Sequence, residues 1–131
     1  MKKVRQNDVT NFWEEEVCGT RAAKKKDIKD YFREISFNRY KSEPYIKQFA
    51  FGESKDFKNK KLLEIGVGAG TDFTEFLKRN AICYGIDATD AAIQKTNDNI
   101  LNSLKNKKYN LEYLKKANAE KLPFKDSTFD M

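Results

Sequence analysis

The feature that most constrains the fold is a short run in which every second residue is glycine, at Gly66, Gly68 and Gly70. An apolar segment, residues 61–65, leads into this run, and residues 71–80 continue it with helical spacing of apolar side chains. Glycines let the backbone turn sharply and let a ligand lie against the main chain. A strand, such a turn and a helix bring free backbone N–H groups together, which predicts a nucleotide-type ligand site.

Further strands and helices alternate after this run. We expect strands over residues 81–86 and 110–116, with a helix between them that Thr89 caps. This alternation predicts an α/β fold with a Rossmann-like, doubly wound parallel sheet built from right-handed crossovers. The apolar residues that the two crossover helices carry are Phe73, Phe76, Leu77, Ala92, Ile93, Ile100, Leu101 and Leu104.

The segment 1–59 is predicted to be helical and to precede the α/β domain, which covers residues 60–131. We expect a short helix over residues 8–17, a longer one over about residues 24–41, and a third near Pro44. Residues 52–59 are polar and indicate a linker. The apolar positions predicted for the last two helices are Ile28, Tyr31, Phe32, Ile35, Arg39 or Tyr40, Tyr45, Ile46 and Phe49.

The spacing of the glycines narrows the choice of ligand. A dinucleotide fingerprint needs its third glycine where this chain has Thr71, and a P-loop needs a Gly-Lys-Ser/Thr sequence that is missing. Glu64, two residues before Gly66, is unfavourable beside a pyrophosphate and suits a cationic cofactor. Asp87 ends the second predicted strand, at the distance from Gly66 where a carboxylate can accept the ribose hydroxyls of an adenosine.

Four segments then occur in order: residues 63–71, 84–87, 117–124 and 127–131. Together they resemble the four successive motifs of class I S-adenosylmethionine (SAM)-dependent methyltransferases, and within that family the small-molecule, ubiquinone-biosynthesis-like branch. The resemblance implies SAM as the cofactor and a set of cofactor-binding residues, namely Glu64, Gly66, Gly68, Gly70, Asp87, Asn118 and Ala119.

The resemblance also implies a role for each of these residues. Glu64 and the three glycines would line the methionine part of SAM, and Asp87 would hold its ribose. The side chain of Asn118 and the backbone N–H of Ala119 would meet the adenine. The family usually has Asp at position 118, but the amide oxygen of Asn can accept a hydrogen bond from the adenine amino group.

The resemblance predicts an enzyme that transfers a methyl group to a small-molecule acceptor. The alternatives are an RNA or protein methyltransferase, or a SAM-binding fragment without catalysis. The family's sheet has seven strands, whereas this chain supplies three and enters the fourth at Phe129. We therefore expect residues 60–131 to form only the first part of the domain, inactive by itself. Catalytic residues and oligomeric state stay unassigned.

The net charge of +6 resides in the segment 1–61, where basic side chains outnumber acidic ones, whereas the segment 62–131 is balanced. Because the charges of the first segment are interleaved, we expect a solvated helical surface and no specific nucleic-acid partner. Two distant cysteines, Cys18 and Cys83, without any histidine, predict neither a metal site nor a disulfide framework, and favour the reducing cytoplasm. No apolar run is long enough to span a membrane.

Aromatic residues of the N-terminal segment leave two interpretations open. Trp13, Tyr31, Tyr40 and Tyr45 could cover the cofactor as a lid, or they could pack the N-terminal helices onto the sheet. Packing is the favoured interpretation, and it predicts that these rings are buried.

Overall fold

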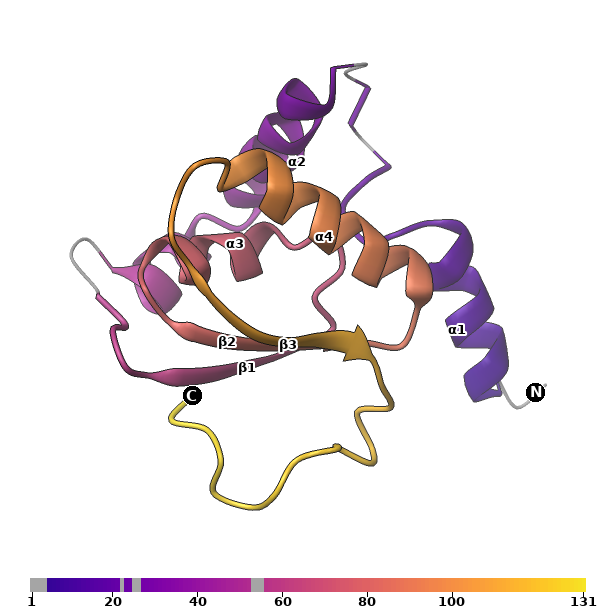
Figure 1. Cartoon of the computed structure of the whole chain (residues 1–131). Helices are drawn as coiled ribbons and strands as arrows, with labels where there is room; N and C mark the ends of the chain where they lie inside the picture. The colour runs from indigo at the N-terminus through magenta and orange to yellow at the C-terminus, as the bar shows by residue number, and fades with distance from the viewer. Residues whose placement is uncertain (1–4, 22, 25–26, 53–55) are drawn as a thin grey trace.

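A computed structural model describes residues 5–21, 23–24, 27–52 and 56–131. Its centre is a sheet of three parallel strands in the order β1 (Lys61–Ile65), β2 (Ile82–Asp87) and β3 (Asn110–Lys116). The crossover helices α3 (Thr71–Lys78) and α4 (Asp90–Ser103) both lie on one face of this sheet (Figure 1). The predicted α/β class and parallel strands are confirmed, as an incomplete Rossmann-like sheet.

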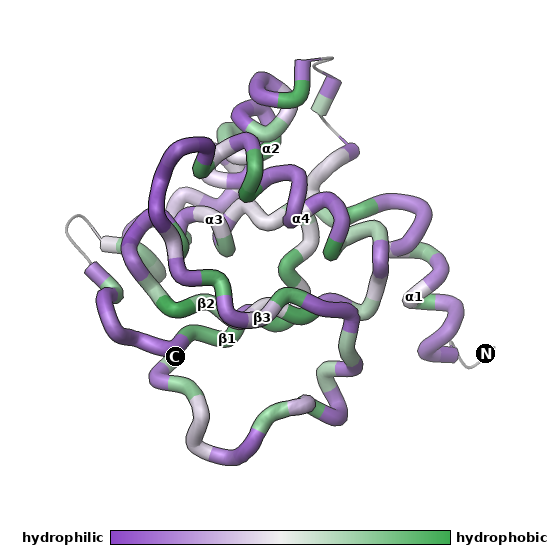
Figure 2. Tube along the Cα trace, viewed as in Figure 1, coloured by the Kyte–Doolittle hydropathy of each residue, from purple (hydrophilic) through white to green (hydrophobic). Residues whose placement is uncertain are grey.

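The main core fills the space between the sheet and these two helices. Phe73 and Leu77, four residues apart on α3, are fully buried, as are Cys83 of β2 and Ile100 of α4. Strands β1 and β2 accordingly show long hydrophobic stretches in Figure 2. Leu101 departs from the expected core, because it is 66% exposed and follows Ile100 by about 100° around the helix.

The other face of the sheet is covered by the chain that follows β3 (Figure 1). There Phe124 makes edge-to-face contacts with Tyr84, Tyr113 and Phe129, with ring centroids 5.0–5.8 Å apart. The N–H of Asp130 then donates to the carbonyl of Lys61 (2.8 Å). The last residues thus run along the outer edge of β1, although no strand is assigned to them.

In the described part of the N-terminal segment, two α-helices and a π-helix precede the sheet: α1 (Gln6–Glu15), α2 (Ile28–Ser42) and η1 (Lys47–Phe51). Helix α2 packs against α3 and α4, the two helices that cover this face of the sheet. Its buried residues are Phe32, Ile35 and Tyr40. The predicted stripe is therefore correct at its centre, whereas Ile28, at the start of the helix, is 47% exposed.

The third N-terminal helix differs most from its prediction. Tyr45 and Phe49 were expected on its buried face, yet they are 53% and 73% exposed, and Phe51 is buried instead. The N–H of Gly52 donates to the carbonyl of Lys47 (2.9 Å), which closes a π-helical turn. This wider turn shifts the inward face away from the positions that a 3.6-residue period selects.

The predicted linker also contributes to the core. Phe57 is only 6% exposed and packs against the main core cluster. Its N–H donates to the carbonyl of Arg79 (2.9 Å), which holds it beside the end of α3. Although the composition of residues 52–59 is polar, Phe57 anchors this segment to the core.

Gly85 lies in the middle of β2 where the core is tightest. A Cβ atom there would lie 2.9 Å from Phe73 Cε2 and Val67 Cγ1 and 3.0 Å from Leu114 Cδ1. We predict that Gly85→Ala lowers the free energy of unfolding by about 1–3 kcal/mol, because the core has no room for a methyl group. Urea denaturation measures this loss. Leu101→Ala, at an exposed site, is the control and should stay within about 0.5 kcal/mol of wild type.

Candidate functional site

The glycine run forms the turn that connects β1 to α3. The N–H groups of Gly66 and Val67 both donate to the carbonyl of Ile86, at 2.8 and 3.2 Å, so the turn lies over the end of β2. Gly66 and Gly68 have left-handed backbone conformations, with φ of +78° and +56°. Other residues adopt such angles at a cost, which explains glycine at these two positions.

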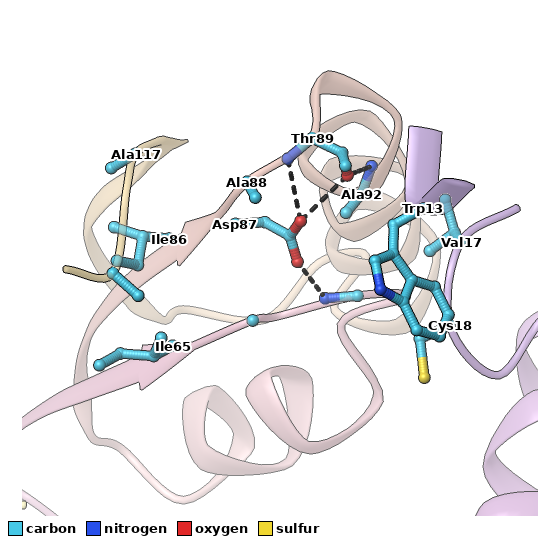
Figure 3. A pocket seen from close by; sticks show the side chains of 13 residues that line it. Trp13, Val17, Cys18, Ile65, Ile86, Asp87, Ala88, Thr89, Ala92 and Ala117 are labelled. Carbon is cyan, nitrogen blue, oxygen red and sulfur yellow. Dashed lines mark hydrogen bonds between the residues drawn. The ribbon is translucent and has the colours of Figure 1, made fainter. Parts of the chain in front are cut away.

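The carboxylate of Asp87 joins this turn to the start of α4 (Figure 3). Its Oδ2 accepts from the N–H of Gly68 (3.1 Å), and its Oδ1 accepts from the N–H and the hydroxyl of Thr89 (both 3.0 Å). The Thr89 hydroxyl in turn accepts from the N–H of Ala92 and so caps α4 (3.2 Å), as predicted. A carboxylate has about four acceptor positions, so these three bonds leave Asp87 one further position.

Two cavities adjoin the glycine turn. The first, of about 250 Å³, has Gly66, Gly68 and Asp87 on one side and Ala117 and Ala119 on another. The N-terminal segment bounds it as well, through Trp13, Val17 and Cys18 (Figure 3).

The second cavity, of about 480 Å³, lies along the other side of the turn, toward Glu64, Asp72 and α2. Both cavities are lined by Cys18, Gly66 and Gly68. An elongated ligand that follows the turn would therefore reach both.

Glu64 carries an unusual carboxyl group into the second cavity. Its Oε2 is buried, and among the described residues no hydrogen-bond partner meets it. Burial, with a smaller contribution from the nearby negative charge of Asp72, raises the pKa of Glu64 to about 8. Arg39 opposes this shift only in part. Burial of an acceptor without a hydrogen-bond partner costs free energy. A ligand that brings a cation or a hydrogen-bond donor to Glu64 would reduce this cost.

Arg39 and Tyr40 bring α2 to the same cavity. The Nε of Arg39 donates to both oxygens of Asp72, at 3.0 and 2.9 Å, and the Tyr40 hydroxyl donates to Asp72 Oδ1 (2.9 Å). The pKa of Arg39 is raised chiefly by its hydrogen bond to Asp72, and the pKa of Tyr40 chiefly by burial. The apolar stripe predicted for this helix includes positions 39 and 40. No local sequence pattern indicates their hydrogen bonds to Asp72, which is distant in sequence.

Five of the seven predicted site residues line a cavity: Glu64, Gly66, Gly68, Asp87 and Ala119. The other two lie elsewhere. Gly70 caps α3, and a Cβ atom there would lie 2.9 Å from the side chain of Thr96, so packing against α4 already requires glycine. Asn118 is not among the residues that line either cavity, and its side-chain oxygen accepts from the N–H of Glu120 (2.9 Å).

The N-terminal aromatic residues divide between the two interpretations. Trp13, 40% exposed, lines the first cavity. Tyr40 is buried and Tyr31 is half-buried against the cluster around Phe32, as the packing interpretation expects. Tyr45 is exposed and donates its hydroxyl hydrogen to Glu43 (2.9 Å). Sequence reasoning did not single out Val17, Thr96 or Asp72, because each acts through a contact distant in the chain.

Two other kinds of site were sought in the described part of the chain. It contains no group of three or more Cys, Asp or Glu side chains arranged to hold a metal ion. None of its helices combines the length and the apolar character that crossing a membrane requires.

Residues 63–131 match the family model described as "Methyltransferase domain". The match spans about half of the chain and includes all seven predicted cofactor-binding residues. No curated protein and no solved structure shows significant similarity to the chain.

Glu64 makes a prediction about stability and pH. Because its pKa in the folded protein, about 8, lies above the ordinary value of 4.5, the folded protein binds the extra proton. This stabilisation is complete below pH 4.5 and is lost as the pH rises through about 8. Between about pH 5 and about pH 9, the free energy of unfolding should therefore fall more in wild type than in Glu64→Gln.

Urea denaturation at the two pH values measures the difference. Glu112→Gln, at an exposed glutamate of β3, is the matched control and should follow wild type. The same pH dependence in wild type and Glu64→Gln would show that the Glu64 carboxyl is not buried as described.

Proposed function

The chain belongs to the methyltransferase-domain family, and from this premise we propose that it transfers a methyl group from SAM to a small-molecule acceptor. Members of the family use SAM as the methyl donor. The observation that carries the proposal is the position of Asp87. Its carboxylate accepts a hydrogen bond from the glycine turn and lines the first cavity.

The residues of the two cavities fit this cofactor. SAM carries a sulfonium and an ammonium group, and Glu64 lines the second cavity with a buried oxygen that has no hydrogen-bond partner among the described residues. A Cβ atom at Gly66 would meet nothing within 4 Å, so any side chain there would occupy cavity space. An acidic lining and a bare backbone are both suited to a cationic ligand that lies against the main chain.

Residues of the two cavities can be assigned to the separate parts of the cofactor. Asp87 would accept one ribose hydroxyl at its remaining acceptor position, and a second only if the Thr89 hydroxyl turned away. Ala119 would border the adenine in the first cavity. In the second cavity, Glu64 would pair with the ammonium group.

The bound cofactor supplies a methyl group already activated by the sulfonium. The task of the chain is therefore to bind, orient and exclude water, and alignment of acceptor and donor can provide a large part of the rate. The glycine turn supplies the rigid part. Its N–H groups from Gly66 to Gly68 are bound to β2, and α4 donates hydrogen bonds to the carbonyls of Gly68 and Ala69. The residues that act on the acceptor stay unassigned.

A small-molecule acceptor is favoured by the walls of the second cavity. Its lining includes Gly19, Arg21 and the α2 residues Ile35 and Arg39, and such a bounded pocket suits a small acceptor better than a wide polymer. This agrees with the resemblance to the small-molecule, ubiquinone-biosynthesis-like branch.

The basic N-terminal segment offers little support for an RNA acceptor. Arg21 pairs with Glu16 (2.7 Å), Arg33 lies 3.7 Å from Asp30, and Arg39 is bound to Asp72. Such pairs reduce the positive potential that phosphate groups require.

The acceptor class is tested by transfer of a labelled methyl group from SAM. Low-molecular-weight metabolites, total RNA and total protein are offered separately as acceptors. Label in the metabolite fraction alone supports the proposal. Label in RNA or protein would select the corresponding alternative, and tight SAM binding without label in any fraction would favour a non-catalytic module.

We predict that Asp87→Ala weakens SAM binding at least about tenfold, because each lost charge-assisted hydrogen bond contributes about 1.5–3 kcal/mol. Isothermal titration calorimetry measures the affinity. Asp90→Ala is the matched control, since Asp90 lies three residues further along and its side chain pairs with Lys116, outside both cavities. Unchanged affinity in Asp87→Ala would remove Asp87 from the site.

Gly66→Ala should also weaken SAM binding, by about tenfold or more, because its methyl group enters the cavity. The left-handed backbone adds a stability cost of about 1–2 kcal/mol. Asn106→Ala controls for that cost, since Asn106 has φ of +65° and is exposed away from both cavities. Thermal melting with and without SAM should show a reduced ligand-induced shift for Gly66→Ala only.

A further inference from the structure

Helix α1 lies at the C-terminal end of the sheet, beside the start of α4 (Figure 1). None of its residues is buried, and its apolar side chains Val9, Phe12 and Trp13 are 46%, 52% and 40% exposed. Burial of apolar surface is the usual reason for a helix to stay docked. Here that contribution is small, so a polar contact has to hold α1 in place.

Glu14 provides this contact. Its Oε2 accepts from the N–H of Asp90 (3.0 Å) and its Oε1 from the N–H of Ala91 (3.1 Å). These are the first two N–H groups of α4, which have no partner within their own helix. The N-terminal end of a helix also carries partial positive charge, which favours a carboxylate. Glu14, which is distant in sequence, thus caps α4 from outside.

The same helix end is joined to the cofactor site. The third N–H of α4, from Ala92, is bound by the Thr89 hydroxyl, which itself donates to Asp87. The end of α4 therefore has Glu14 on one side and the predicted ribose ligand Asp87 on the other.

Lys116 Nζ, which pairs with Asp90 Oδ2 (2.8 Å), adds positive charge near Glu14. The pKa of Lys116 is raised, chiefly by Asp90 and to a smaller extent by Glu14.

Trp13 precedes Glu14 in α1 and lines the first cavity (Figure 3). When the Glu14 carboxylate is bound to α4, the indole is held at that cavity. When the contact breaks, apolar burial does little to keep α1 and Trp13 there.

We propose that Glu14 is a positioning residue of the cofactor site: by capping α4 from α1, it holds Trp13 over the first cavity and slows the departure of the bound cofactor. The identity of the ligand rests on the proposed function, whereas the attachment of α1 does not. Loss of the carboxylate should therefore expose Trp13 in the free protein and shorten the lifetime of the complex.

Trp13 is the only tryptophan of the chain, so intrinsic tryptophan fluorescence reports on α1 alone. The variants are Glu14→Ala, Glu14→Gln, which keeps one acceptor oxygen without the charge, and Glu15→Ala. Glu15 is the matched control, because it is an exposed neighbouring carboxylate without a hydrogen bond or ion pair in the described part of the chain. Circular dichroism checks that all variants keep wild-type helix content and melting.

The first measurement uses the free protein and acrylamide quenching of Trp13. We expect stronger quenching in Glu14→Ala than in wild type, an intermediate value in Glu14→Gln, and the wild-type value in Glu15→Ala. Wild-type quenching in Glu14→Ala would overturn the proposal, since the indole would then be held by other contacts.

The second measurement is the dissociation rate of SAM and of its demethylated product, followed by stopped-flow fluorescence. We expect about a tenfold faster rate in Glu14→Ala, as lost carboxylate contacts at a helix N-terminus imply, and the wild-type rate in Glu15→Ala. Stronger quenching with an unchanged dissociation rate would mean that α1 is merely attached and would overturn the positioning role. A wild-type protein that binds no SAM would overturn the proposed function, while the quenching result would still decide the attachment.

Discussion

The carboxylate of Asp87 is the interaction on which the site depends. It fixes Gly68 at the turn between β1 and α3 and Thr89 at the start of α4. Without it, the two adjacent crossovers of the sheet would lose this shared contact. The turn would keep its bonds to Ile86 and those that Thr96 and Asn99 of α4 donate to the carbonyls of Gly68 and Ala69. Because the same carboxylate retains one acceptor position, it can serve both the fold and a ligand.

The N-terminal helices are attached to this centre by polar contacts in addition to the apolar packing of Phe32 and Ile35 on Ala69 and Ala92. Arg39 and Tyr40 join α2 to Asp72 at the start of α3, and Glu14 joins α1 to the start of α4. In both cases a group from the N-terminal segment meets the first turn of a crossover helix. These first turns adjoin the glycine run, so α1 and α2 line the cavities there, whereas Phe57, further along the N-terminal segment, packs in the main core.

Glu64 shows how the site departs from ordinary stability rules. Among the described residues no hydrogen-bond partner meets its buried Oε2, which costs free energy in the protein without ligand. The main core beside it, around Phe73 and Leu77, is tightly packed and can sustain that cost. A cationic ligand at Glu64 would relieve part of it, which links binding to stability.

The sequence by itself determined the three strands, the two crossover helices, the Thr89 cap and the glycine turn, because each follows from side-chain period or turn chemistry within a few neighbouring residues. Only the tertiary structure decided which side chains are buried and which residues line a cavity. Gly70 packs on Thr96 away from both cavities, Phe51 and Phe57 are buried whereas Phe49 is exposed, and Trp13 alone among the N-terminal aromatics reaches the first cavity. Those outcomes depend on contacts such as Glu14 with α4, between residues far apart in the chain, and no local pattern encodes a contact that exists only after the chain has folded.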